Sequence, residues 1–337
     1  MKRLILRASV VILFLGAFMV ASAFGQEKQI LIRYTHQHPT NMSFHKGGEV
    51  FCKYVEQKSN GRVKFEMYPA SQLYKASETI KAVTSGAVEM GHVTMDEFGT
   101  HFPMGYITYQ PFLIDSDEAR LSVTKGKVAA LFEKETARVG GKIMFYMPHD
   151  QSAWLGNNKR PLKVLKDFDG VLIRTTPGQV PILEALGAKG VRMNVGEVYM
   201  AMQRGTVDGC LSSPSSATDR KWEDVTKYTT ILDLVAVYNT ALMNMNFWNK
   251  LPADIQKIML EGNLEAEKFV KKMAKEKEDA ALEILKKRTQ LYMLPPDEAA
   301  RWEKATTVVI DNYVKKGGPI VKEAVEELYR IKKANKK

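Results

Sequence analysis

The sequence lacks the short motifs that mark the common enzyme classes. It has no G-x-S-x-G nucleophile motif, no Walker A motif, and no G-x-G-x-x-G after a predicted strand. It also lacks H-E-x-x-H and any cluster of acidic, cysteine and histidine residues that would complete a metal site. The local sequence therefore offers no catalytic centre, and we expect no cofactor.

Cysteine is scarce, with only Cys52 and Cys210 among 337 residues. Cys52 falls in a predicted helix of the first half, and Cys210 follows a predicted strand of the second. A disulfide between them would link two separate structural units covalently. We therefore expect both cysteines to be free thiols.

Long apolar runs are confined to the N-terminus. A basic start at residues 2–7 overlaps the apolar run Leu4–Val20, and the small residues 21–23 follow. This order is typical of a signal peptide, so we expect residues 1–23 to be cleaved and the protein to be periplasmic. An uncleaved anchor helix is the alternative.

Acidic residues are fewer than basic ones. The sequence has 38 Asp and Glu and 49 Lys and Arg, which gives a net charge of +11. The cations are scattered and are densest in the C-terminal helices. Such a distribution is typical of solvated helix faces rather than of a nucleic-acid surface. We therefore expect no nucleic acid partner.

What the sequence does contain is a regular alternation of strand and helix patterns. Apolar residues alternate at 30–34 and 63–67, which predicts strands, and helical spacing follows each of them. The alternation continues and indicates an α/β fold with a largely parallel sheet. The β-rich run 229–247 is interpreted as two strands that cross between lobes.

The segment from Leu251 to Arg288 carries apolar residues at helical spacing. A continuous helix of this length would reach roughly 55 Å, which exceeds one small lobe. It either kinks at Gly262–Asn263 or runs along both lobes, and a coiled coil is a further alternative. A strand at 291–294 and two helices end the chain.

One stretch of the sequence occurs almost twice. EVYMAMQRGTVDG at 197–209 aligns with ETIKAVTSGAVEM at 78–90, and each copy reads as a helix, a glycine stop and a buried strand. Two lobes built on one plan would leave a cleft, and clefts bind ligands. A chance likeness between two α/β units is the alternative.

Arg174 is the strongest candidate for ligand binding, because it ends an otherwise apolar strand at 171–175. Open α/β sheets bind ligands at the carboxyl ends of their strands. A buried arginine needs an anion, which is either a protein carboxylate or a ligand carboxylate held bidentately.

Histidines and serines supply the other candidates. All six histidines precede residue 150, and His36 and His38 could offer two metal nitrogens, but nothing completes a metal site. The serine-rich run 212–216 is either a loop whose hydroxyls face a ligand or an exposed turn.

Six segments together resemble the DctP-type solute-binding subunit of tripartite ATP-independent periplasmic (TRAP) transporters. The resemblance covers nearly the whole mature chain. The segments are NGRVKFEMYPASQLY, SGAVEMGHV, YQPFLIDSDEA, NNKRPLKVLKDFDGVLIR, GEVYMAMQRGTVDG and NFWNKLPADIQ.

The resemblance implies an α/β, two-lobed periplasmic binding protein clamshell with crossover strands and a long helix spanning both lobes. We expect lobe 1 to hold 24–150 plus about 239–278, and lobe 2 to hold 151–238 plus about 279–337. The resemblance further implies a monomer without enzymatic activity. It would close on a small organic anion and present it to the TRAP membrane subunits.

In the family, the arginine matching Arg174 pairs with the ligand carboxylate. Many relatives carry a second arginine at the position of Ala153. Its loss here favours a monocarboxylate with an apolar or aromatic body, stacked by Trp154.

The remaining predicted site residues surround that ligand. Phe98 would wall the pocket together with the tryptophan, and Thr94, His36, Gln151 and Ser213 would supply hydrogen bonds. A protonated His36 would add positive charge and make affinity pH-dependent.

Two other functions remain open at this point. The first is an exported hydrolase that uses Ser213 with a cleft histidine. The second is a metal carrier that uses His36 and His38.

Overall fold

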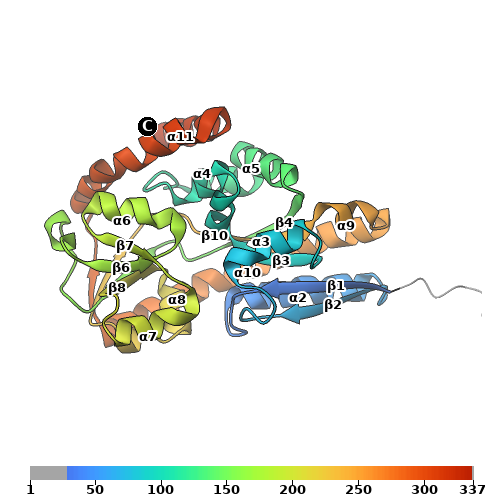
Figure 1. Ribbon diagram of the computed structural model, residues 1–337, viewed down its shortest axis with the longest axis horizontal. Helices are drawn as coiled ribbons and strands as arrows, with labels where there is room; N and C mark the ends of the chain where they lie inside the picture. The colour runs from blue at the N-terminus through green and yellow to red at the C-terminus, as the bar shows by residue number, and fades with distance from the viewer. Residues whose placement is uncertain (1–28, 336–337) are drawn as a thin grey trace, which may run out of the picture.

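The computed structural model describes residues 29–335, which form two lobes that each contain one β-sheet (Figure 1). The predicted signal peptide, residues 1–23, lies outside the described residues. Within 29–335, no helix is long and apolar enough to cross a membrane. The two-lobed α/β architecture agrees with the fold expected from the sequence.

The sheet of lobe 1 has the strand order β2-β1-β3-β10-β4. Strands β1, β2 and β3 are parallel, whereas β10 runs antiparallel to both of its neighbours. Their bounds are β1 (Ile30–His36), β2 (Val63–Tyr68), β3 (Met90–Thr94), β4 (Gly141–Pro148) and β10 (Tyr238–Asn244). The surrounding helices are α2 (Ser43–Lys58), α3 (Ala76–Thr84), η1 (Met95–Thr100), η2 (Pro103–Tyr109), α4 (Asp117–Lys125), α5 (Lys127–Arg138) and α9 (Met245–Lys250).

The sheet of lobe 2 has the order β11-β9-β5-β8-β6-β7, in which β5 is antiparallel to β8 and β9. The strands are β5 (Ala153–Asn157), β6 (Leu172–Thr175), β7 (Lys189–Arg192), β8 (Gly209–Ser212), β9 (Tyr228–Leu232) and β11 (Gln290–Met293). The helices are η3 (Leu165–Phe168), η4 (Pro177–Gln179), α6 (Val180–Leu186), η5 (Val195–Glu197), α7 (Val198–Gln203), α8 (Pro214–Asp219) and η6 (Trp222–Val225).

Two chain segments cross between the sheets, at 149–152 and 233–237. The first leads from β4 to β5, and the second leads from β9 to β10. The prediction that 229–247 holds two strands crossing between lobes is therefore confirmed. The crossings also explain why β5 and β10 are antiparallel to their neighbours in otherwise largely parallel sheets.

Helix α10 (Ala253–Arg288) is continuous and spans both lobes. Its first half contributes Met259 and Val270 to a core of lobe 1, and Leu285 packs into a core of lobe 2. The helix does not kink at Gly262–Asn263. A Cβ at Gly262 would lie within 3.3 Å of side chains of α2, so glycine there permits close packing of the two helices.

Helix α11 (Pro296–Asn335) bends at Gly318, whose φ is 74°. Trp302 packs into a core of lobe 2, whereas Val325 and Leu328 pack into a core of lobe 1. Figure 1 shows α11, in red, lying across both lobes. The predicted assignment of all of 279–337 to lobe 2 therefore does not describe the C-terminal part of the chain, because α11 packs into a core of lobe 1 from Ile310 onward.

The two copies of the repeated stretch adopt the same local structure. Helix α3 leads through Gly86 (φ 80°) into β3, and helix α7 leads through Gly205 (φ 72°) into β8. A positive φ is a conformation that glycine adopts without steric cost, so both turns need it. The prediction of helix, glycine stop and buried strand is confirmed for both copies.

Both cysteines are free and buried, as expected. Cys52 belongs to a core of lobe 1 and Cys210 to a core of lobe 2.

Candidate functional site

A cavity of ≈ 470 Å³ lies between the lobes, where the carboxyl ends of several strands meet. Both lobes contribute to its lining. The lining residues that matter for its chemistry are Thr94, Glu97, Tyr109, Arg174, Arg192, Ser213, Arg220 and Trp222. Three arginines against few acids make the cavity suited to anions.

Arg174, at the carboxyl end of β6, is buried and lines the cavity. Its Nε and Nη2 donate to the Met193 carbonyl oxygen at 3.1 and 2.8 Å, and Nη1 lies 3.9 Å from Cys210 Sγ. Among residues 29–335, no carboxylate lies within ion-pairing distance of this guanidinium. The sequence left two anionic partners open for Arg174, a protein carboxylate and a ligand carboxylate. The structure shows no protein carboxylate in that role among residues 29–335.

Arg220, which follows α8, is a second cation in the lining that the sequence motifs did not indicate. Its Nη2 lies 3.5 Å from Met42 Sδ, its buried Nε has no hydrogen-bond partner, and its guanidinium carbon lies 5.8 Å from the Trp222 ring centroid. Burial, together with the charge of Arg174, lowers the pKa of Arg220 to about 10. A half-buried guanidinium with so few partners is poised for an anion.

Trp154 does not wall the cavity, contrary to the expectation from the sequence. It is fully buried on β5, where Nε1 donates to Thr229 Oγ1 at 3.2 Å. Its ring stacks against Trp222, with centroids 6.1 Å apart, and Trp222 is the one that lines the cavity. The reason is geometric, since a side chain within a strand faces one surface of its sheet rather than the strand's end.

Phe98 is likewise outside the lining. It is fully buried in a core of lobe 1, where its ring contacts those of Phe102 and Phe132 at centroid distances of 5.7 and 5.2 Å. Gln151 also lies elsewhere, because it is exposed in the first crossing segment, where its backbone N–H donates to Glu278 Oε2 at 2.9 Å.

His36 belongs to a histidine cluster, defined as His36, His38, His45, His92 and His149. The rings of His36 and His92 stack with centroids 4.6 Å apart, and those of His38 and His92 with centroids 4.7 Å apart. His36 is fully buried and outside the cavity lining, and burial with the nearby His45 lowers its pKa to about 3. It therefore presents no positive charge to a ligand between pH 5 and 8, which corrects that expectation.

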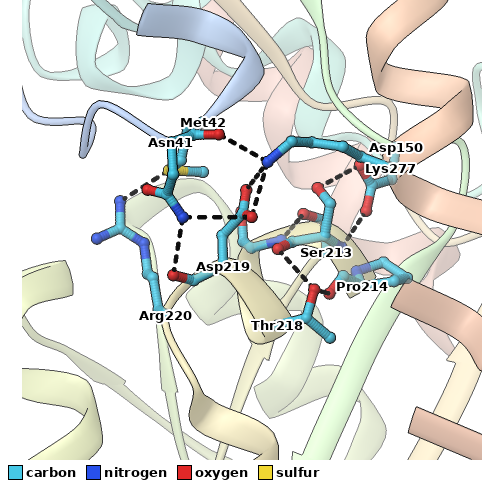
Figure 2. Close-up of polar contacts among 11 residues, drawn as sticks. Asn41, Met42, Asp150, Ser213, Pro214, Thr218, Asp219, Arg220 and Lys277 are labelled. Atoms are coloured by element: carbon cyan, nitrogen blue, oxygen red, sulfur yellow. Dashed lines mark hydrogen bonds and ion pairs between the residues drawn. The ribbon is translucent and has the colours of Figure 1, made fainter. Parts of the chain in front are cut away.

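Thr94 and Ser213 line the cavity from opposite lobes, at the ends of the two repeated units. Ser213 Oγ lies 3.5 Å from His149 Nδ1, and Asn239 Nδ2 lies 2.8 Å from His149 Nε2. Figure 2 shows Ser213 at the start of α8, close to Asp150.

The Ser213–His149 pair is not arranged for catalysis. Asn239 Oδ1 is engaged by His38 Nε2 at 3.0 Å, so the Asn239 amide donates to His149 Nε2. His149 therefore carries its proton on Nδ1 and cannot accept one from Ser213. Burial also lowers the pKa of His149 to about 3, which makes it a weak base.

Glu97 and Arg192 lie across the cavity from each other, on lobes 1 and 2. Their closest side-chain atoms are 3.9 Å apart. Burial and the neighbouring Asp96 raise the pKa of Glu97 to about 7. Glu97 therefore adds a titratable acidic group to the lining, within electrostatic reach of Arg192 and Arg174.

Metal binding has no support in the described part of the chain. Residues 29–335 contain no group of three or more His, Cys, Asp or Glu side chains placed to hold an ion. The rings of His36 and His38, the predicted pair, instead each stack against the His92 ring.

Of the seven predicted site residues, the structure brings Arg174, Thr94 and Ser213 to the cavity. Arg220 and Trp222 are the additions. The only sequence signal for them was their position a few residues beyond the serine-rich run, since the short helix α8 carries the chain back to the cavity.

Comparison with known proteins gives a consistent result. Residues 34–316 match the model of the family described as DctP, bacterial extracellular solute-binding protein, family 7. The C4-dicarboxylate-binding periplasmic protein DctP of Rhodobacter capsulatus is 30% identical over 320 residues, covering 90% of this chain and 94% of that protein.

Solved structures show the same fold. A TRAP periplasmic solute-binding protein from Ochrobactrum anthropi superposes with a TM-score of 0.81 at 25% identity, covering 92% of this chain and 98% of the other. The sugar acid binding protein DctPAm from Advenella mimigardefordensis, in complex with galactonate, gives 0.84 at 19% identity, covering 90% and 99%. The chain therefore belongs to the DctP family of bacterial extracellular solute-binding proteins, the non-enzymatic receptors of TRAP transporters.

Proposed function

We propose that this protein captures a small organic acid in the cavity between its lobes and that Arg174 binds the ligand carboxylate. The observation that carries the proposal is the pair of arginines in the cavity lining, buried Arg174 and half-buried Arg220, with no carboxylate within ion-pairing distance among residues 29–335. Buried charges are costly unless paired, so the ligand supplies the missing anion. The acids bound by the relatives named above agree with this chemistry.

The class of ligand that we propose is broader than the monocarboxylate expected from the sequence. The preference for a monocarboxylate rested on Ala153 in place of an arginine and on stacking by Trp154. Because Arg220 supplies a second cation and Trp222 supplies the aromatic wall, we extend the ligand class to acids with a second oxygen acceptor. Thr94 and Ser213 then donate hydrogen bonds to the ligand's remaining oxygens.

Location and partners follow from the family. TRAP solute-binding proteins are periplasmic and deliver their ligands to membrane subunits. We propose that this chain is exported through its N-terminal segment, acts as a monomer and serves such subunits.

The test is a thermal-shift screen of organic acids followed by calorimetry with Arg174→Met. A ligand at 100 times its Kd should raise the unfolding free energy by about 2.7 kcal/mol. Loss of a buried carboxylate partner weakens binding at least about 30-fold.

Arg138→Met is the matched control, because Arg138 is exposed on α5 and pairs only with Glu135. It should bind the acids as the wild type does. If Arg174→Met retains wild-type affinity for the acid that binds, the carboxylate does not sit at Arg174 and the proposed site is wrong.

A further inference from the structure

A group of polar contacts joins the two lobes beside the ligand cavity (Figure 2). Lys277 Nζ donates to the Asn41 carbonyl oxygen at 2.8 Å and to both Asp219 carboxylate oxygens at 2.7 and 2.8 Å. Asn41 Nδ2 donates to the Asp219 carbonyl oxygen at 3.3 Å and to Oδ1 at 3.4 Å. Each of the three residues thus contacts the other two.

The three residues come from different parts of the fold. Asn41 lies in lobe 1, just before α2, whereas Asp219 ends α8 in lobe 2, and Lys277 belongs to the spanning helix α10. The side chains of Lys277 and Asp219 are 22% and 16% exposed. Partial burial reduces screening by water and salt, so this ion pair is stronger than a fully exposed one.

The contacts are continuous with the ligand cavity through Arg220. Arg220 follows Asp219 directly and lines the cavity, while its Nη2 lies 3.5 Å from Sδ of Met42, which follows Asn41. Two consecutive residues of lobe 2 therefore hold two consecutive residues of lobe 1. Opening the cavity would separate these pairs.

We infer that Asn41, Asp219 and Lys277 form a latch that holds the lobes closed, so that they set affinity without touching the ligand. This inference rests on the proposed function, in that the ligand occupies the cavity that the latch closes. When only the closed form binds tightly, apparent affinity scales with its population. The latch residues are positioning residues, and weakening them lowers affinity for every ligand by one common factor.

Lys277→Met tests the latch, because it removes the ammonium group and keeps an apolar stem on α10. We expect Kd to rise about three- to tenfold, the range for a partly buried ion pair. The factor should be the same for each acid that binds. Most of the rise in Kd should come from a faster dissociation rate. Lys275→Met is the matched control, since Lys275 lies on the same helix and pairs only with Asp279.

Asn41→Ala is the second variant, because it removes the amide contacts with Asp219 and leaves the backbone bond to Lys277. It should raise Kd by a smaller common factor. Equal Kd values for both variants and the wild type, or a loss confined to some acids, would overturn the latch.

The distance between the lobes in the ligand-free protein tests this inference separately from the proposed function. Spin labels at Lys53→Cys and Lys189→Cys, exposed positions on α2 and β7, report the distance between lobes. Lys277→Met should shift the distance distribution of the ligand-free protein toward longer values, whereas Lys275→Met should not. An unchanged distribution refutes the latch even if organic acids bind, and a shifted one supports it even if none does.

Discussion

Replacing His92 with phenylalanine tests the charge state of the histidine cluster. The His92 ring stacks against both His36 and His38, and phenylalanine keeps an aromatic ring in that place. The buried Nε2 has no hydrogen-bond partner, and only the 3.2 Å contact of Nδ1 with Tyr34 Oη is lost. The substitution removes one titratable group at small cost to packing.

The expected effect follows from the pKa of His92, which burial and the neighbouring histidines hold well below the usual 6.5. The folded protein keeps the ring neutral, whereas the unfolded chain takes up a proton below about pH 6.5. The stability from the neutral ring is therefore complete above that pH and is lost as pH falls toward the folded-state pKa. Each proton that only the unfolded chain binds lowers the free energy of unfolding by about 1.4 kcal/mol for each pH unit of acidification.

The cluster as a whole contributes several such protons. Four of its members have a lowered pKa, with burial the main cause in each: His36, His38, His92 and His149. Burial acts in the opposite sense on Asp150 and Glu97, where it raises each pKa to about 7. These two carboxyls hold protons in the folded state that the unfolded chain releases above about pH 4, so they offset two of the four histidines. The cluster therefore makes the folded protein less stable as pH falls below about 6.5, and the buried carboxyls reduce that loss.

The assay is urea unfolding at pH 7.5, 5.5, 5.0 and 4.5, with the free energy of unfolding plotted against pH. His92→Phe should reduce the slope by about 1.4 kcal/mol per pH unit relative to wild type. His101→Phe is the comparison, because His101 is exposed and outside the cluster. Burial lowers the pKa of His101 as well, but less far than that of His92, so its slope should change less. Parallel lines for His92→Phe and wild type would mean that His92 is protonated in the folded state, and the reasoning would fail.

Four further substitutions test the crossing segment, packing and the wall of the cavity. Glu278→Ala removes the acceptor of three hydrogen bonds from residues 151–152, and urea unfolding should show a loss of about 3 kcal/mol. Trp154→Ala should cost about 3–5 kcal/mol in the same assay, whereas Trp222→Ala should weaken ligand binding about tenfold by calorimetry. Gly91→Ala places a Cβ 2.5 Å from Thr79 Cγ2 and should lower stability by about 1–3 kcal/mol.

The position of Arg174 could be predicted because it depends on a short-range rule. A strand pattern locates the carboxyl end of β6, and that end of a parallel sheet faces the ligand site. The same logic placed Thr94 and Ser213, which follow the two repeated units, on opposite sides of the cavity. Each of these predictions needed only the end of a strand, which the hydrophobic pattern marks.

The predictions that failed depended on which side of an element faces the cavity. Trp154 is the second residue of β5 and so lies close to the crossing segment. Its ring nevertheless faces the helices that cover the sheet, where Trp222 stacks on it. Arg220 reaches the cavity only through the path of α8 and the contact with Met42 in the other lobe. The chain returns to lobe 1 within α11, at Ile310, before the bend at Gly318. None of these features has a periodic signal in the sequence.

The first crossing segment joins the movement of the lobes to the cavity, because its residues are bonded to α8, β10 and α10. His149 contacts Ser213 and Asn239, Asp150 accepts from the backbone and hydroxyl of Ser215 at 2.5 and 2.6 Å, and Ser152 donates to Glu278 on α10. A rotation of one lobe must therefore carry Ser213 and the start of α8 with it. The end of α8 holds Asp219 and Arg220, so one short helix connects the crossing segment, the ligand cation and the contact between lobes. An anion bound at Arg220, as proposed above, would thus act beside the end of the same short helix that makes the contact between the lobes.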